Sequence, residues 1–173
     1  VTFKPDSEFN FKKLHATKSV VLINNGIHPG EPDGIDASMM LMRDLVYSKI
    51  ELPKNTVLAL IPIYNVGGSL NRNTSTRANQ NGPEAYGFRG NALNYDLNRD
   101  FIKNDTENAK SFQQLFHMVK PDFFVDTHVS NGADYQYTLT HLYTQEDKLG
   151  EPLGVLQNQF KKDISTLLKE QGL

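Results

Sequence analysis

A histidine and a glutamate stand three positions apart in the segment His28-Pro29-Gly30-Glu31. An imidazole nitrogen and a carboxylate oxygen are both groups that bind zinc in proteins. Pro29 and Gly30 favour a turn between the two side chains, which would let them converge on one point. Taken alone, this pattern is more often a chance pair on a surface loop. The metal-site interpretation therefore depends on what the rest of the chain supplies.

A second histidine, His128, ends a later apolar run that begins at Asp122. Two histidines and one glutamate, with a fourth position open for water, are the ligand set of a hydrolytic zinc site. Asp126 lies on the same face of an extended strand as His128, so it could orient the imidazole through a hydrogen bond. The alternative for His128 alone is a hydrogen-bonded histidine at a strand end.

Strands that alternate with helices would bring these side chains together. The apolar runs Ser19–Asn25 and Thr56–Tyr64 indicate buried strands. Between them, apolar residues at helical spacing predict a helix over Asp33–Ile50, with its first residue as the N-cap. This order predicts a right-handed βαβ unit in a parallel sheet. Side chains that follow the carboxyl ends of such strands, as His28 and Glu31 do, gather at one edge of the sheet.

The same periodicities predict the remaining elements. A helix is expected over Asp105–Val119, capped by Asp105 or Thr106, with a structural His117. Residues 1–18 are expected to be irregular. The other predicted elements are a third strand over Asp122–His128, a fourth strand over Tyr135–Thr144, a turn over Glu151–Gly154 and a helix over Val155–Glu170.

A long polar segment, Asn65–Asn98, separates the second strand from the second helix. It is rich in glycine and asparagine and has neither a helical nor a strand period. A loop of this length inside a compact domain is usually functional, because loops present binding groups on a rigid scaffold. We therefore expect it to form a wall of a substrate site, with a flexible, solvated loop as the alternative.

The composition is that of an ordinary globular protein. The chain has 173 residues, of which 38% are hydrophobic and 22% are charged. Its net charge is −2 and it has no basic block, so neither a nucleic-acid partner nor a membrane surface is expected. No apolar stretch approaches the ~20 residues that span a bilayer. Because the chain contains no cysteine, a metal site has to use His, Asp and Glu.

Three blocks of the sequence resemble the zinc carboxypeptidases of the carboxypeptidase A superfamily, the M14 type. The blocks are His28–Glu31, Arg89–Phe101 with its groups Arg-x-Asn-Ala and Asp-Leu-Asn-Arg-Asp-Phe, and Asp126–His128. Their order, the spacing within each block and the preceding strands agree with this family. The resemblance covers roughly residues 19–144, and the middle block is its most specific part.

The resemblance implies a fold and a set of roles. The fold would be three-layer α/β/α with a mixed, largely parallel central sheet, and residues 1–173 would form a single catalytic-type domain. One Zn²⁺ would be bound by His28, Glu31 and His128. The oxyanion at the scissile carbonyl would be stabilised by Arg89, and the terminal carboxylate of the substrate would be held by Asn98 and Arg99.

The implied activity is zinc-dependent hydrolysis of an amide bond beside a free carboxylate, through a zinc-bound water. Its substrate would be a peptide or an N-acyl amino acid. The resemblance also favours a secreted or periplasmic protein. Two other functions fit the same residues. One is an N-acyl amino acid amidohydrolase of the succinylglutamate desuccinylase or aspartoacylase type. The other is a non-catalytic module that binds zinc or a carboxylate ligand.

Three features depart from the family pattern. Asn65-Val66-Gly67-Gly68 stands where the family usually has Asn-Pro-Asp-Gly, and Asn94 replaces a common glycine. The family's general base is a glutamate on a strand well beyond the third ligand. The acids after His128 do not match that context; they include Glu146, Asp147, Glu151, Asp163 and Glu170. We therefore expect a fragment that lacks the C-terminal part of the domain, with a zinc-binding pseudo-enzyme as the alternative.

Overall fold

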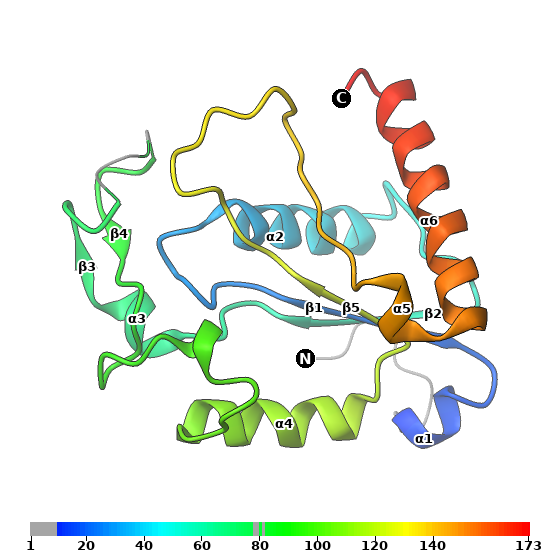
Figure 1. Cartoon of the computed structure of the whole chain (residues 1–173), viewed down its shortest axis with the longest axis horizontal. Helices are drawn as coiled ribbons and strands as arrows, with labels where there is room; N and C mark the ends of the chain where they lie inside the picture. Colours follow the sequence, from blue (N-terminus) through cyan, green and yellow to red (C-terminus); the bar gives the residue numbers. More distant parts are fainter. Residues whose placement is uncertain (1–9, 78–79, 81) are drawn as a thin grey trace. The chain divides into compact units, whose positions relative to one another are not determined.

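The computed structural model describes residues 10–77, 80 and 82–173. They form five strands, six α-helices and one 3₁₀ helix (Figure 1). The chain divides into two compact units, Val1–Gly132 (unit 1) and Ala133–Leu173 (unit 2). The expectation of a single catalytic-type domain stays a prediction.

Unit 1 is built on a three-stranded parallel sheet. Its strands lie in the order β2-β1-β5, with bounds β2 Thr56–Ile61, β1 Ser19–Asn24 and β5 Phe123–Asp126. Asn24, the last residue of β1, is paired with Ile61 on one side and with Asp126 on the other, so the three carboxyl ends are level. The α/β class and the parallel pairing of the first two strands are thereby confirmed. Within the described residues this sheet is wholly parallel rather than mixed.

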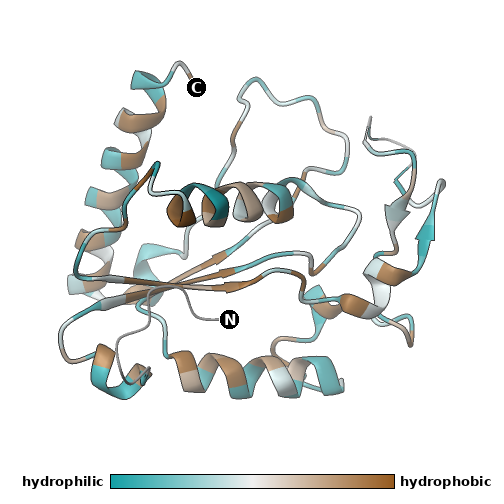
Figure 2. Ribbon diagram, turned by 180° about the vertical axis from the view of Figure 1, so that it is seen from behind, coloured by the Kyte–Doolittle hydropathy of each residue, from teal (hydrophilic) through white to brown (hydrophobic). Residues whose placement is uncertain are grey.

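Two helices lie on opposite faces of the sheet: α2 (Asp33–Val46) on one and α4 (Glu107–Val119) on the other (Figures 1 and 2). The predicted cap of α2 is wrong, because Pro32 is the N-cap and Asp33 lies in the first turn. There its carboxylate faces the positive end of the helix dipole. The cap of α4 is Thr106, one of the two predicted residues, whose side-chain oxygen accepts a hydrogen bond from the Ala109 amide.

The hydrophobic core of unit 1 lies between the sheet and α4. Val20 and Leu22 of β1 are buried and pack with Val119 at the end of α4. Figure 2 shows the apolar character of the three strands. Phe112 and Phe116 of α4 add a cluster of aromatic rings on the same face of the sheet. Burial of this face fixes α4 against the sheet and hence fixes the segment that leads into it.

The three predicted strands of this sheet are longer than the observed ones, the first by a single residue, since β1 ends at Asn24 rather than Asn25. β2 ends at Ile61 rather than Tyr64, because Pro62 has no N–H group to continue a ladder. β5 ends at Asp126, so the prediction that His128 belongs to the strand is wrong. The Thr127 amide still donates a hydrogen bond to Asn24 O, and the chain then leaves the sheet.

The sequence between β2 and α4 shows no helical or strand period, yet the segment contains four short elements. These are α3 (Val66–Leu70), the antiparallel pair β3 (Arg72–Asn73) and β4 (Tyr86–Gly87), and the 3₁₀ helix η1 (Leu97–Arg99). The fully buried Asn65 caps α3 through Gly68 N, and its amide donates to the main-chain oxygens of Ile27 and Arg89. This single side chain therefore ties the segment to the loop that follows β1.

The N-terminal prediction is wrong where it can be compared. Residues 1–9 lie outside the described residues, whereas α1 forms one short helix over Phe11–Leu14. The side chain of Asn10 caps it by accepting hydrogen bonds from the amides of Lys12 and Lys13.

Unit 2 is helical and contains no strand among its residues. The predicted strand Tyr135–Thr144 is wrong, because an alternating sequence forms a strand only where a partner supplies hydrogen bonds. The helices are α5 (Glu146–Leu149) and α6 (Glu151–Glu170). The predicted turn at Glu151–Gly154 is also wrong, since Pro152 lies in the first turn of α6, where its missing N–H costs nothing. Among the described residues, no helix combines the length and the apolar character needed to cross a bilayer.

Candidate metal centre

The three predicted ligands come together at the carboxyl ends of β1 and β5. One ligand atom from each of His28, Glu31 and His128 can be chosen so that all three lie within 4.8 Å of one another. His28 and Glu31 are both only 3% exposed, and His128 is about one-third exposed. The sequence prediction that these three side chains converge is thereby confirmed.

The register of the sheet explains this convergence. β1 and β5 are adjacent and parallel, and Asn24 and Asp126 are paired at their ends. His28 follows the first strand by four residues and His128 follows the second by two. Gly26, in the loop between β1 and His28, has φ +65°, a conformation that an L side chain rarely adopts. The ligands therefore meet because two neighbouring strands end at the same level.

Each imidazole presents Nδ1 to the carboxylate of Glu31. The Nδ1 atom of His28 lies 3.0 Å from Oε1, and the Nδ1 atom of His128 lies 3.0 Å from Oε2. The amide of Val129 donates a further hydrogen bond to Oε2 at 3.1 Å. Burial raises the pKa of Glu31, but the hydrogen bonds from His128, His28 and Val129 outweigh burial and hold it well below its ordinary value.

The outer nitrogen of each ring is held by an aspartate. Asp96 Oδ1 lies 3.0 Å from Nε2 of His28, and Asp126 Oδ2 lies 2.9 Å from Nε2 of His128. With a metal ion in place of the proton at Nδ1, a carboxylate at Nε2 would hold the remaining imidazole proton on that nitrogen and leave the Nδ1 lone pair for the metal. The orienting role considered for Asp126 therefore fits its position. The role of Asp96 was not predicted from the sequence, although this residue lies inside the Asp-Leu-Asn-Arg group.

The donor set fits a divalent cation. Two imidazole nitrogens and one carboxylate oxygen, largely buried and already oriented by outer hydrogen bonds, match a three-ligand site with an open position. His28, Glu31 and His128 could thus hold a metal ion. This set suits zinc and also other first-row divalent ions. The three ligands alone therefore do not identify the metal.

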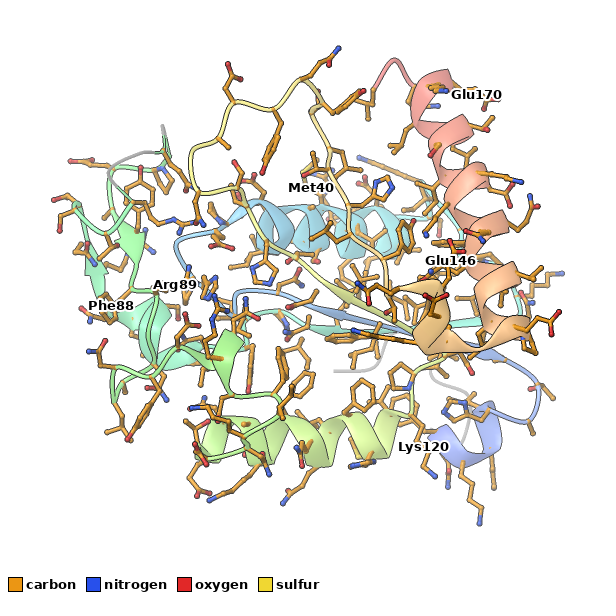
Figure 3. All side chains as sticks on the ribbon, in the orientation of Figure 1. Met40, Phe88, Arg89, Lys120, Glu146 and Glu170 are labelled. Atoms are coloured by element: carbon orange, nitrogen blue, oxygen red, sulfur yellow. The ribbon has the colours of Figure 1, made fainter. Side chains whose placement is uncertain are left out.

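Arginines surround the acidic members of the centre. Arg89 donates from Nε to Asp96 Oδ2 at 3.0 Å, and its Nη1 lies 3.8 Å from Glu31 Oε1. Figure 3 shows Arg89 beside the carboxyl ends of the strands. Arg77 donates from Nη2 to Glu31 Oε1 at 2.8 Å and is almost completely buried. Nothing in the local pattern around Arg77 predicts this contact with a residue 46 positions away.

The two residues predicted to hold a substrate carboxylate lie on η1. The amide of Asn98 donates to Asp96 Oδ1 at 2.9 Å, which links η1 to the carboxylate that orients His28. Arg99 is exposed and donates from Nη1 to the main-chain oxygen of Asn98 at 2.9 Å. The structure thus connects the main chain of Asn98 to the centre through Asp96, and the role of both side chains in binding a carboxylate stays a prediction.

No protein-family model, no curated protein and no solved structure matches this chain. Membership of the zinc carboxypeptidase family therefore stays a prediction from the three sequence blocks.

The metal-free centre should make stability depend on pH. Hydrogen bonds with Asp126 and Glu31 raise the pKa of His128 from its ordinary 6.5 to about 9. A raised pKa stabilises the fold fully below pH 6.5, and this contribution is lost as the pH rises through about 9. We expect the melting temperature in excess chelator to fall across this window. Because His128 is partly exposed, the loss should be about 1–2 kcal/mol.

The matched variant for this measurement is His128→Asn, which removes the titrating group and should flatten the curve between pH 6.5 and 9. A melting temperature that stays level or rises across this window in the parent chain would contradict the expected proton on His128. The low pKa of Glu31 acts in the opposite direction. Its contribution is present above its ordinary pKa of 4.5 and fades only in stronger acid.

Proposed function

We propose that this chain belongs to a zinc-dependent, metallocarboxypeptidase-like hydrolase that cleaves an amide bond beside a free carboxylate. The observation that carries the proposal is the arrangement of the two imidazoles. Both direct Nδ1 towards one buried carboxylate, and both are held at Nε2 by an aspartate. Oriented imidazoles of this kind are typical of metal sites rather than of chance surface clusters. The proposal includes the M14-type, three-layer α/β/α fold.

The metal would be held by His28, Glu31 and His128. When bound, Zn²⁺ supplies a Lewis acid that polarises a carbonyl and lowers the pKa of a coordinated water towards ~7. Asp96 and Asp126, each at Nε2 of one ring, would hold the two imidazoles in the tautomer that a bound metal requires. The low pKa of Glu31 keeps this ligand ionised throughout the neutral range.

Arg89 is the residue that would stabilise negative charge on the scissile carbonyl oxygen. Its guanidinium group lies next to the ligand set, and its Nε is tethered by Asp96. The tether limits rotation of the group, so its remaining N–H donors are oriented before substrate binds. A preorganised donor of this kind is worth about 3 kcal/mol at a developing oxyanion.

No residue of the chain is assigned as general base. The later acids named from the sequence belong to unit 2, on α5 and α6. The proposal concerns metal binding, polarisation of the carbonyl and capture of the substrate carboxylate.

The function is tested by assaying three substrates in parallel with the zinc-loaded full-length product of the gene. They are a peptide with a free C-terminus, the same peptide with an amidated C-terminus and an N-acyl amino acid. The proposal expects hydrolysis of the free-acid peptide and little of the amidated one. Turnover of the N-acyl amino acid alone would replace the peptidase by an amidohydrolase. Stoichiometric Zn²⁺ without turnover of any of the three would favour the non-catalytic binding module.

Arg99→Lys should raise the KM for the free-acid peptide about tenfold or more, with kcat nearly unchanged. A planar guanidinium can bind both oxygens of a carboxylate, whereas an ammonium group cannot make the paired contact. Steady-state kinetics on the free-acid and amidated peptides separate this role from a general loss of fold. An equal loss of kcat/KM on both peptides would contradict carboxylate capture by Arg99.

A further inference from the structure

A buried arginine outside the predicted roles contacts the carboxylate of the metal centre. Arg77 is 7% exposed, and its Nη2 donates to Glu31 Oε1 at 2.8 Å. Its Nε donates to the side-chain oxygen of Gln80 at 3.1 Å. One guanidinium group therefore joins a candidate ligand to a neutral amide from its own segment. A buried guanidinium is costly to desolvate unless its partners are well placed, so this arrangement needs an explanation.

The second partner, Gln80, is itself anchored. Its Nε2 donates to the main-chain oxygen of Ser130, two residues beyond His128. Its main-chain oxygen accepts a hydrogen bond from the hydroxyl of Tyr86 at 2.9 Å. Arg77 and Gln80 thus connect the segment between β3 and β4 to both loops that carry the candidate ligands.

The Arg77 side chain packs closely against the backbone of the ligand loop at Gly30. A Cβ atom added at Gly30 would lie 3.0 Å from Cγ of Arg77 and 3.0 Å from the main-chain oxygen of Gly87. The residue before Glu31 therefore has to be small for the arginine stem to cross the ligand loop at this height. Because Gly87 O is as close to this position as Arg77 Cγ, a larger residue at position 30 would also collide with the main chain of β4.

We infer that Arg77 is a positioning residue for Glu31, an inference that rests on the proposed metal-dependent function. The Val129 amide fixes Oε2 of the carboxylate and Arg77 fixes Oε1, so neither oxygen can rotate away from the two imidazoles. The planar fork is needed because Arg77 binds Glu31 and Gln80 at the same time. A lysine would keep the charge but could not reproduce both contacts in this geometry.

The test is the Zn²⁺ affinity of the full chain, measured near neutral pH by competition with a chromophoric chelator. Arg77→Met should weaken binding about 10–100-fold, the range seen when a group that orients a ligand is removed. The Zn²⁺ affinity of Arg77→Lys should lie within about threefold of that of Arg77→Met, because the planar guanidinium is lost although the positive charge remains. The control is Arg43→Met on α2, an exposed arginine paired with Asp44, which should stay within about twofold of the parent.

Gln80→Ala leaves Arg77 in the sequence and removes the side-chain oxygen that its Nε binds. It therefore tests the inference even if Arg77→Met fails to fold. It should weaken Zn²⁺ binding by about three- to tenfold, less than loss of the arginine itself. Unchanged affinity in either Arg77→Met or Gln80→Ala would overturn the inference. Full restoration by Arg77→Lys would also overturn it, since charge alone would then be sufficient.

The two proposals fail in different ways. A parent chain that takes up no Zn²⁺ would overturn the metal centre and the role of Arg77 together. A full-length gene product that binds Zn²⁺ but hydrolyses none of the three substrates would overturn the hydrolase only. The ratio of affinities between the parent and Arg77→Met would then still decide the role of Arg77.

Discussion

His28→Ala and His128→Ala should each abolish stoichiometric Zn²⁺ binding at micromolar protein. Only three side chains form the candidate ligand set, so either substitution removes one-third of the donors. With roughly 10–16 kcal/mol of binding free energy spread over the ligands of a structural zinc site, loss of one ligand costs several kcal/mol. We expect affinity to fall by at least about 10²–10³-fold. Metal analysis by mass spectrometry after gel filtration measures the stoichiometry directly.

His117→Ala is the matched control for these variants. His117 lies on α4, is exposed, and its ring contacts Phe116 rather than the centre. It should therefore retain the parent's zinc content. Equal zinc in all four proteins would show that the metal binds elsewhere or without specificity. Loss of zinc in His117→Ala as well would show that the substitutions act through the fold and not through the ligand set.

The convergence of the ligands was predictable because it depends on strand order more than on detail. The apolar runs that became β1 and β5 are each followed by a histidine. Parallel pairing places such residues at one edge of a sheet whatever the exact strand bounds. The erroneous inclusion of His128 in the strand therefore did not affect the prediction, since an error of two residues left it at the same edge.

The groups that orient the ligands were not predictable in the same way. Asp96 contacts a residue 68 positions away and Arg77 one 46 positions away, through a segment with no regular period. No local pattern specifies such contacts, because they arise from tertiary packing of short elements. At Tyr135–Thr144 the sequence instead predicted an element that the structure does not contain. Its alternation resembles a strand, yet the decisive property of a strand is a partner, and alternation does not reveal one.

The polar residues at the end of β1 link the centre to the packing below it. Asn24 donates to Asp126, the carboxylate that orients His128, at 2.8 Å. The neighbouring Asn25 accepts from the hydroxyl of Thr127 at 2.8 Å and donates to Ser38 on α2 at 3.0 Å. These contacts join β1, β5 and α2 next to the loops that carry the ligands. Displacement of α2 should therefore shift the ligands and lower the affinity for Zn²⁺.

Gly34→Ala should destabilise the protein and weaken its metal site together. A Cβ atom at Gly34, in the first turn of α2, would lie 2.1 Å from Oγ1 and 2.4 Å from Cβ of Thr127. Oγ1 can rotate about the Cα–Cβ bond, but Cβ cannot move without moving the backbone that leads to His128. Overpacking of this kind costs about 2–3 kcal/mol, which exceeds the ~1 kcal/mol that alanine gains over glycine in a helix. The net loss is then about 1–2 kcal/mol, so we expect the melting temperature to fall by roughly 2–8 °C.

The comparison variant is Gly154→Ala on α6, where the nearest atom to the new Cβ would be Glu146 O at 3.7 Å, an ordinary contact. It should be neutral or stabilising by up to about 1 kcal/mol. Thermal unfolding and chelator competition on both variants separate the two effects of Gly34→Ala. If Gly34→Ala matched Gly154→Ala in both measurements, the close contact between α2 and Thr127 would have no energetic consequence. Lowered stability with unchanged Zn²⁺ affinity would show that His128 is positioned independently of α2.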